Sequence, residues 1–260
     1  MELVSLHPFD PAVARSYVQA LLGQQAPPPE WSAWWSPRLM RAISEAREGS
    51  EAAANQLTFG FAQALSTEHP AFTKDGFGLS VWEARVDRGV GMLMRPPARL
   101  FADAGLDPGI SRAMPVRIDL QLGMMGGAWI PARLIPDLER LLDARLERMA
   151  KRLHEAEYDP YSMIGLMLDA VRYASQHGLG LYEALDVIGP GGEAIPGTVV
   201  VTSDRKRIPG EIKSRIELAI KPPKKPGLFS RMLGRGGGAD DTTETYPGFP
   251  TDDPEQSDKA

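Results

Sequence analysis

The stretch DPYSMIGLMLDAVRYASQHG, residues 159–178, decides how the rest of the chain must be arranged. Asp159 followed by Pro160 is typical of a helix start, and Gly178 after His177 is typical of a helix end. The side chains between them leave little polar surface, since most are apolar: Met163, Ile164, Leu166, Met167, Leu168 and Val171. A helix that is apolar on nearly all sides is buried. We therefore expect this helix to lie near the centre of the core.

Further helices are predicted on both sides of this segment. Each of three N-terminal segments begins with a residue that commonly caps a helix, followed by apolar residues at helical spacing. A longer segment before the buried helix has one apolar row and a solvated opposite face. The predicted elements outside the sheet region are helices beginning at Asp10, Ser36 and Ser50, a long helix over 136–157, a short helix over 181–188, a strand over 198–202 and a last helix over 209–220.

The middle of the chain changes from the helical period to the two-residue alternation of strands. Residues 80–94 alternate around Asp87-Arg88-Gly89, which predicts a β-hairpin. Residues 116–122 alternate most regularly, and residues 128–130 predict a short returning strand. Antiparallel sheets typically have one buried face and one solvent-exposed face. The sequence therefore predicts an α+β fold, with a small, mostly antiparallel sheet packed by helices.

Composition changes after residue 220. The remaining segment is rich in Pro and Gly and has too few apolar groups to offset the entropy of ordering it. We expect a single α+β domain over residues 1–220, with a helical part over about 8–66 and the sheet and remaining helices over about 78–220. A disordered tail is expected over residues 221–260, with a basic-apolar peptide over 221–235 and an acidic end over 236–260.

The net charge of −5 hides a strong contrast between segments. Residues 205–235 carry +8, residues 236–260 carry −6, and the other residues carry −7. An acidic body repels nucleic-acid backbones and anionic membranes, so the basic stretch has to make any such contact. There is no cysteine, no basic secretory leader and no apolar run of spanning length, so we expect a cytoplasmic protein without a transmembrane segment.

No motif with a recognisable chemistry is found in the sequence. The four histidines, His7, His69, His154 and His177, are scattered, and no pair has the spacing that places two metal ligands on one helix face. The glycine-rich segments lack the strand-to-helix context of a phosphate-binding loop. We therefore expect no metal and no cofactor, and the pattern favours a non-enzymatic protein over an enzyme.

The strongest functional pattern lies in the basic-apolar peptide of residues 221–235. Its apolar residues fall on one stripe of a short helix, and such a peptide is too short to be helical unless it folds against something. We expect it to bind another protein, because the acidic end behind it opposes stable attachment to a negative surface. Two alternatives stay open: a weak contact of this peptide with an anionic membrane, and a tail whose apolar residues have no function. Binding to nucleic acid is disfavoured. The residues concerned are Leu228, Phe229, Arg231, Met232, Leu233 and Arg235.

Two other sets of residues are candidates for a site. Trp31, Trp34 and Trp35 follow a proline run, and they form either a partner-binding surface or a clamp that holds this connection on the core. Arg117 and Asp119 lie on the polar face of the predicted strand, where Asp119 could act as a base if burial raised its pKa.

The leading hypothesis is a non-enzymatic intracellular interaction or regulatory protein whose C-terminal peptide docks to a partner protein. The alternative is an enzyme or small-ligand-binding protein with a site on the sheet face and adjacent loops.

Overall fold

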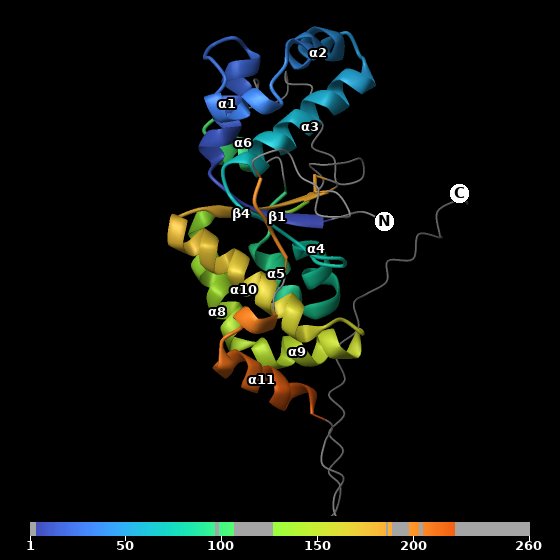
Figure 1. Cartoon of the computed structure of the whole chain (residues 1–260), viewed down its shortest axis with the longest axis vertical. Coiled ribbons are helices and arrows are strands. Elements are labelled where there is room, and N and C mark those ends of the chain that lie inside the picture. Colours follow the sequence, from blue (N-terminus) through green and yellow to red (C-terminus); the bar gives the residue numbers. More distant parts are fainter. Residues whose placement is uncertain are drawn as a thin grey trace, which may run out of the picture. The chain divides into compact units, whose positions relative to one another are not determined.

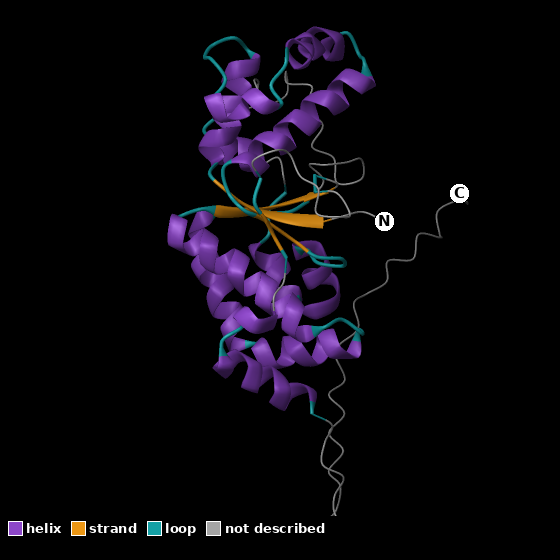
Figure 2. Cartoon of the chain, in the orientation of Figure 1, coloured by secondary structure: helices purple, strands orange, loops and turns teal. Residues whose placement is uncertain are grey.

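A computed structural model of the chain describes residues 4–96, 99–106, 127–185, 187–188, 198–202 and 205–221. The chain divides into two units, Met1–Lys221 and Pro222–Ala260, and every described residue belongs to the first. In this unit a five-stranded sheet lies between two groups of helices (Figures 1 and 2). The predicted domain boundary at residue 220 stays a prediction.

The sheet has the order β3-β4-β1-β2-β5, with β1 in its middle. β1 pairs antiparallel with β4 along six residues and antiparallel with β2, and β3 pairs antiparallel with β4. The α+β class is thus confirmed, but the sheet is mixed rather than mostly antiparallel, because β5 runs parallel to β2. The strands are β1 (Val4–Phe9), β2 (Ala71–Thr73), β3 (Trp129–Ile130), β4 (Gly180–Leu185) and β5 (Val200–Val201).

Helices cover both sides of the sheet. On one side lie α1 (Pro11–Leu21), α2 (Pro37–Arg47), α3 (Glu51–Thr67) and α6 (Arg99–Asp103) (Figure 1). On the other side lie α4 (Leu79–Val81), α5 (Arg88–Leu93), α8 (Ile135–Ala144), α9 (Leu146–Glu155), α10 (Pro160–His177) and α11 (Gly210–Ile220). The predicted caps are confirmed, since the side chains of Asp10, Ser36, Ser50 and Asp159 each accept a backbone N–H at a helix start. No helix among the described residues is long and apolar enough to cross a membrane.

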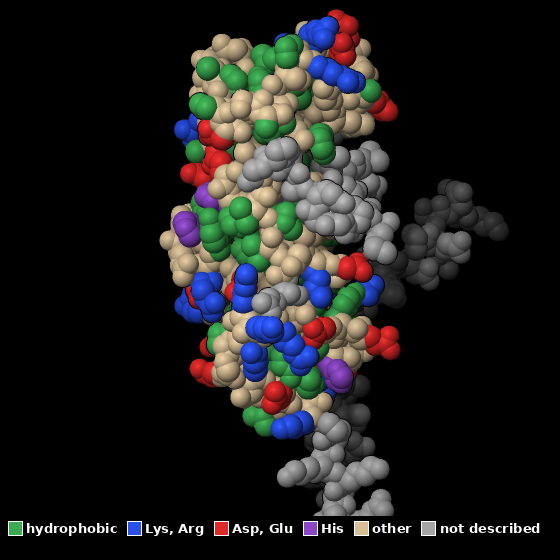
Figure 3. Space-filling view, viewed as in Figure 1, with side chains coloured by type: hydrophobic (Ala, Val, Ile, Leu, Met, Phe, Trp, Pro, Cys, Tyr) green, Lys and Arg blue, Asp and Glu red, His purple; other side chains and the backbone are tan. Residues whose placement is uncertain are grey.

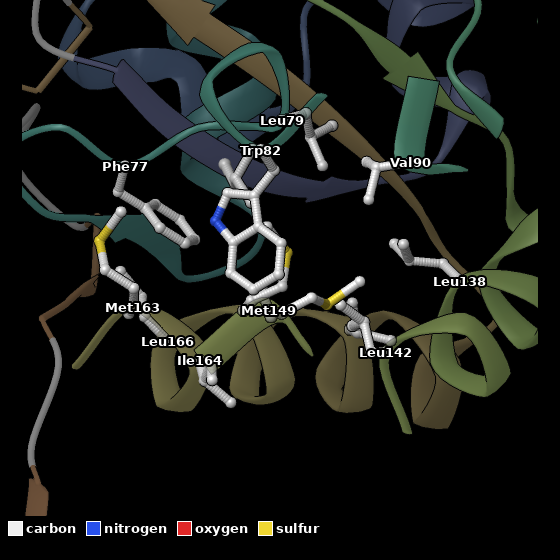
Figure 4. Close-up of a cluster of buried hydrophobic side chains, with 14 of the residues drawn as sticks. Phe77, Leu79, Trp82, Val90, Leu138, Leu142, Met149, Met163, Ile164 and Leu166 are labelled. Atoms are coloured by element: carbon white, nitrogen blue, oxygen red, sulfur yellow. The ribbon is translucent and has the colours of Figure 1, made fainter. Parts of the chain in front are cut away.

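Side chains that alternate along the strands divide the buried residues into two cores. On β4, Leu181 belongs to the first core, with the buried sides of α8, α9 and α10, whereas Tyr182 belongs to the second core, with α1 and α3. Met163 and Leu166 of α10 have no exposed surface, so the predicted central position of this helix is confirmed. Figure 4 shows the Trp82 indole in the middle of the first core, pointing toward the helices beneath it.

The hairpin predicted over residues 80–94 is wrong. This segment forms α4, a π-helical turn over Trp82–Val86, and α5. Trp82, Val86 and Val90 are four residues apart and all buried, so a helical stripe was present beside the alternation that indicated strands. Asp87 caps α5 instead of forming a hairpin turn.

Other differences have related causes. The segment predicted as a helix over 181–188 contains most of strand β4, which lies between β1 and β3 and is buried on both faces, so it lacks the alternation of a half-exposed strand. The long helix predicted over 136–157 is interrupted at Arg145, whose φ of −122° departs from helical geometry. The short strand predicted over 128–130 is confirmed as β3, and the last helix is confirmed as α11. The strand predicted over 116–122 lies outside the described residues.

Candidate anion-binding site

A π-helical turn positions the central carboxylate of the candidate site. The Asp87 N–H donates to the carbonyl oxygen of Trp82, five residues earlier, at 2.7 Å. The backbone then becomes extended at Asp87 (φ −153°), and the Asp87 carboxylate accepts the Gly89 N–H at 2.8 Å. Isolated π-helical turns frequently occur at functional sites. This turn therefore marks the start of α5 as a place to look for a site.

Three arginines of the α8–α9 junction and α9 point toward this turn. Arg145, Arg148 and Arg152 are three and four residues apart, which places them on one helix face. Arg145 Nη1 donates to Asp87 Oδ1 at 2.8 Å, and Arg148 Nη2 donates to Asp87 Oδ2. Arg152 Nη1 donates to the carbonyl oxygen of Val86 at 3.3 Å. One carboxylate thus orients two guanidinium groups, and the backbone beside it orients a third.

The Asp87 carboxylate is 1% exposed and stays ionised. Burial alone would raise its pKa, but hydrogen bonds from Arg148 and from the Gly89 N–H, together with the charges of Arg145 and Arg148, hold the pKa below its usual value. A buried carboxylate of this kind fixes the positions of its partners. The arginines are therefore pre-organised in the free protein.

These groups line a cavity of about 400 Å³, which we call the arginine pocket: Ala84, Asp87, Arg88, Gly89, Arg145, Arg148 and Arg152. Four arginines against one carboxylate give its lining a formal charge of +3. The side chains of Arg145 and Arg148 remain 43% and 53% exposed, so the donors that Asp87 does not use are accessible. Arg88 is exposed and forms no ion pair with any residue that the structure describes. Such a site attracts an anion from solution.

Gly89 is required for the close packing at the floor of the pocket. A Cβ atom at this position would lie 2.7 Å from Arg145 Nη1 and 2.9 Å from Asp87 Oδ1. It would also lie 2.8 Å from Leu141 Cδ1. A larger residue would therefore displace the Arg145 guanidinium from Asp87. The pocket thus depends on a glycine as well as on its charges.

Lys and Arg side chains are unevenly placed on the molecule. On the face drawn in Figure 3 they gather over the group of helices that includes α8 to α11, and few lie over the sheet. Most of these cations are exposed and are screened by solvent. What distinguishes the arginine pocket is that two of its four cations, Arg145 and Arg148, are held by one buried carboxylate.

The three tryptophans singled out in the sequence lie together around Tyr17. Trp31 is fully buried in the second core, and its ring stacks on Trp35 with centroids 5.6 Å apart. Trp34 and Trp35 are half-buried, and Trp34 stacks on Tyr17 at 6.4 Å. The indole N–H groups of Trp31 and Trp34 have no hydrogen-bond partner among the described residues. The cluster holds the connection between α1 and α2 on the core, and a partner contact through it stays a prediction.

The other predicted site residues fall outside the described part of the chain. Arg117 and Asp119 lie there, as do the tail residues Leu228, Phe229, Arg231, Met232, Leu233 and Arg235. The roles predicted for these residues therefore stay predictions.

The residues of the arginine pocket were missed in the sequence. In the sequence, the spacing of Arg145, Arg148 and Arg152 is the signal for the pocket, but it predicts only a solvated helix face. Their partner Asp87 is 58 residues before Arg145 and was placed in a hairpin turn. The sequence alone offered no reason to bring the two segments together.

Comparisons with known proteins add nothing to this geometry. No protein-family model, no curated protein and no solved structure matches the chain. Within the described residues, no group of three or more His, Asp or Glu side chains is placed to hold a metal ion. The arginine pocket is therefore interpreted from its own chemistry.

Proposed function

We propose that this chain is a binding protein for small polyanions and that the arginine pocket is its ligand site. The observation that carries the proposal is a pocket lined by four arginines, two of which, Arg145 and Arg148, are held by one buried carboxylate, Asp87. Guanidinium groups recognise phosphate and carboxylate oxygens through paired hydrogen bonds. Because Asp87 already holds two of them in place, a ligand has less side-chain entropy to remove on binding.

The balance of charge supports a ligand-binding role beyond a structural one. Asp87 neutralises one of the four positive charges of the pocket lining, and like charges in one cavity repel one another. A bound anion relieves this repulsion. A purely structural ion pair for Asp87 needs neither Arg88 nor Arg152. The described lining residues include no nucleophile, and their one carboxylate is engaged by arginines, which favours binding over catalysis.

Calorimetric titration with pyrophosphate tests the proposal. Arg88→Gln removes a pocket cation that forms no ion pair among the described residues, so the fold should be retained. A hydrogen bond to a charged group contributes about 1.5–3 kcal/mol, so we expect this variant to bind pyrophosphate about 10- to 100-fold more weakly than the unchanged chain.

Arg172→Gln is the matched control. Arg172 lies on α10 in an ion pair with Asp169 and is not part of the pocket lining, so its loss removes the same charge elsewhere. We expect its affinity to equal that of the unchanged chain. Absence of saturable pyrophosphate binding at millimolar concentrations, or equal weakening by both variants, would overturn the proposal.

A second candidate function rests on the sequence of residues 221–235. Its apolar stripe beside basic residues favours docking to a partner protein in the cytoplasm, with weak contact to an anionic membrane as a lesser possibility. This role is compatible with anion binding in Met1–Lys221, because the two use different parts of the chain. It would make the protein a non-enzymatic regulator with a ligand site and a docking peptide.

A further inference from the structure

We infer that the arginine pocket selects a terminal phosphoryl group, that is, a phosphate monoester, over phosphodiesters and carboxylates. The inference rests on the proposed function, because it specifies the class of anion that the same pocket takes. Three properties of the pocket support it: its charge, the arrangement of its donors and the character of its rim.

The charge of the pocket suits a dianion. Its lining carries +3, counting four arginines and Asp87. A phosphate monoester carries about −1.5 to −2 at pH 7, whereas a phosphodiester and a carboxylate each carry about −1. The additional negative charge of the monoester interacts with the same fixed cations at the same short distances. A monoester therefore gains more from this pocket than either monoanion does.

The donors approach from two elements. One face of α9 carries Arg148 and Arg152, and the N-cap residue of α9 is Arg145. Arg88 is the first residue of α5. A guanidinium group presents its N–H donors in a fixed plane, and the nitrogens that are bonded neither to Asp87 nor to the Val86 carbonyl are available. A monoester has three terminal oxygens that accept hydrogen bonds, and a diester has two. Donors from different directions favour the group with more terminal oxygens.

The rim of the pocket indicates what lies beyond the phosphoryl group. Among the described residues no aromatic side chain lines the pocket, so these residues offer no surface on which a nucleotide base could stack. Met92 is four residues after Arg88, hence on the same side of α5, and it is 80% exposed. An exposed, adaptable methionine suits contact with a small carbon skeleton. In this inference the ester part of the ligand lies outside the pocket, and Met92, which is not part of the lining, is its candidate contact.

Phosphate monoesters come from two sources, sugar phosphates and phosphorylated side chains, and both present the same terminal group. The experiment compares phenyl phosphate, glycerol 3-phosphate and capped phosphoserine with dimethyl phosphate and acetate by calorimetry, at pH 7.5 and constant ionic strength. We expect each monoester to bind at least about tenfold more tightly than dimethyl phosphate and acetate, because of its extra charge. Tighter binding of phosphoserine than of glycerol 3-phosphate would indicate a phosphoprotein, and the reverse order would indicate a metabolite; both orders support the inference.

A pair of variants tests the role of the rim. Met92→Ser should weaken binding of phenyl phosphate several-fold and leave binding of inorganic phosphate unchanged. Leu218→Ser is the control, since Leu218 is 69% exposed on α11 and is not part of the pocket lining. If Met92→Ser and Leu218→Ser both leave phenyl phosphate binding unchanged, the assignment of the ester side to Met92 is wrong.

The anion-binding function and the selectivity for phosphate monoesters can be overturned separately. Equal affinity for phenyl phosphate, dimethyl phosphate and acetate would overturn the selectivity, while an Arg88→Gln effect on pyrophosphate would keep the anion-binding function. Absence of binding by all of these anions and by pyrophosphate would overturn both.

Discussion

At the scale of single residues, His7 is a buried histidine whose ionisation should limit stability in acid. It lies on β1, 1% exposed, with Nε2 2.8 Å from Ser5 Oγ and with Nδ1 unpaired, and burial lowers its pKa to about 4. The unfolded chain binds this proton near pH 6.5, so stability is full above pH 6.5 and falls as the pH drops toward 4. A difference of this size corresponds to about 3 kcal/mol.

His7→Gln removes this titration and keeps a polar side chain beside Ser5. We expect urea unfolding at pH 7 and pH 4.5 to show a smaller loss of stability in the variant than in the unchanged chain. His154→Gln changes an exposed histidine and should behave like the unchanged chain. Equal losses in all three proteins would mean that His7 does not limit stability in this pH range.

Single residues also show what the sequence could and could not predict. The helix caps at Asp10, Ser36 and Asp159 were predicted because each interacts with a backbone N–H two or three residues away. Asp87 was not assigned to a site, because its partners Arg145 and Arg148 are distant in sequence. Hydrogen bonds between neighbouring residues can be inferred from the sequence, whereas a site built from distant segments depends on how the helices pack.

At the scale of elements, α11 is held against α8 and α9 by a buried side chain, by partly buried apolar neighbours and by one ion-pair group. Ile216 has no exposed surface, and Arg215 donates to Asp143 and Glu147 at 2.6 Å each. We expect Ile216→Ala to lower the free energy of unfolding by about 2–4 kcal/mol, because it leaves a cavity in the first core. Arg215→Ala should cost less, about 0.5–1 kcal/mol, because its partners are largely exposed.

Denaturant unfolding monitored by circular dichroism measures these differences. Leu218→Ala is the matched control on the same helix, since Leu218 is 69% exposed, and we expect it to stay within about 0.5 kcal/mol of the unchanged chain. A cost for Ile216→Ala no larger than that for Leu218→Ala would show that α11 contributes little to the fold.

Elements differed in how well the sequence predicted them. The helices with amphipathic stripes and caps, such as α1, α2 and α10, were found, whereas β1 was missed and β4 was taken for a helix. β4 is buried between neighbours in the sheet and lacks a clear alternation, so its residues are equally compatible with a buried helix. In β1, apolar Val4 and Leu6 do alternate with polar Ser5 and His7, but the run is only six residues long and both faces of it are buried. The periodicity of apolar residues therefore does not identify a strand whose two faces are both buried.

At the scale of the whole molecule, charge is concentrated in particular places. The body outside residues 205–260 carries a net charge of −7, yet four arginines converge in the arginine pocket. An anionic ligand is repelled by the body at long range and attracted by the pocket at short range. The pocket lies in the group of helices over which Lys and Arg side chains gather, while the net negative charge of the body as a whole disfavours a long nucleic acid and is consistent with binding of a small anion.

The C-terminal segment provides a last prediction for the full chain. Residues 221–235 combine an apolar stripe with basic side chains, and the proposal that they dock to a protein makes the apolar stripe decisive. Leu228→Ser with Phe229→Ser removes two apolar side chains and keeps every charge. Arg231→Gln with Arg235→Gln removes two charges and keeps the stripe. The two double variants therefore separate docking into an apolar groove from attraction to a negative surface.

Two measurements distinguish these modes. Quantitative affinity purification from a native cell lysate should recover the partner at least about tenfold less with Leu228→Ser/Phe229→Ser, because burial of each large apolar side chain contributes about 1.5–3 kcal/mol. Flotation with phosphatidylserine vesicles should show little binding by any of the proteins, since the acidic end of residues 236–260 opposes attachment. If instead Arg231→Gln/Arg235→Gln abolishes strong vesicle binding and Leu228→Ser/Phe229→Ser leaves the recovered proteins unchanged, the segment acts as a membrane contact. The protein-docking proposal would then be wrong, while anion binding by the arginine pocket would be unaffected.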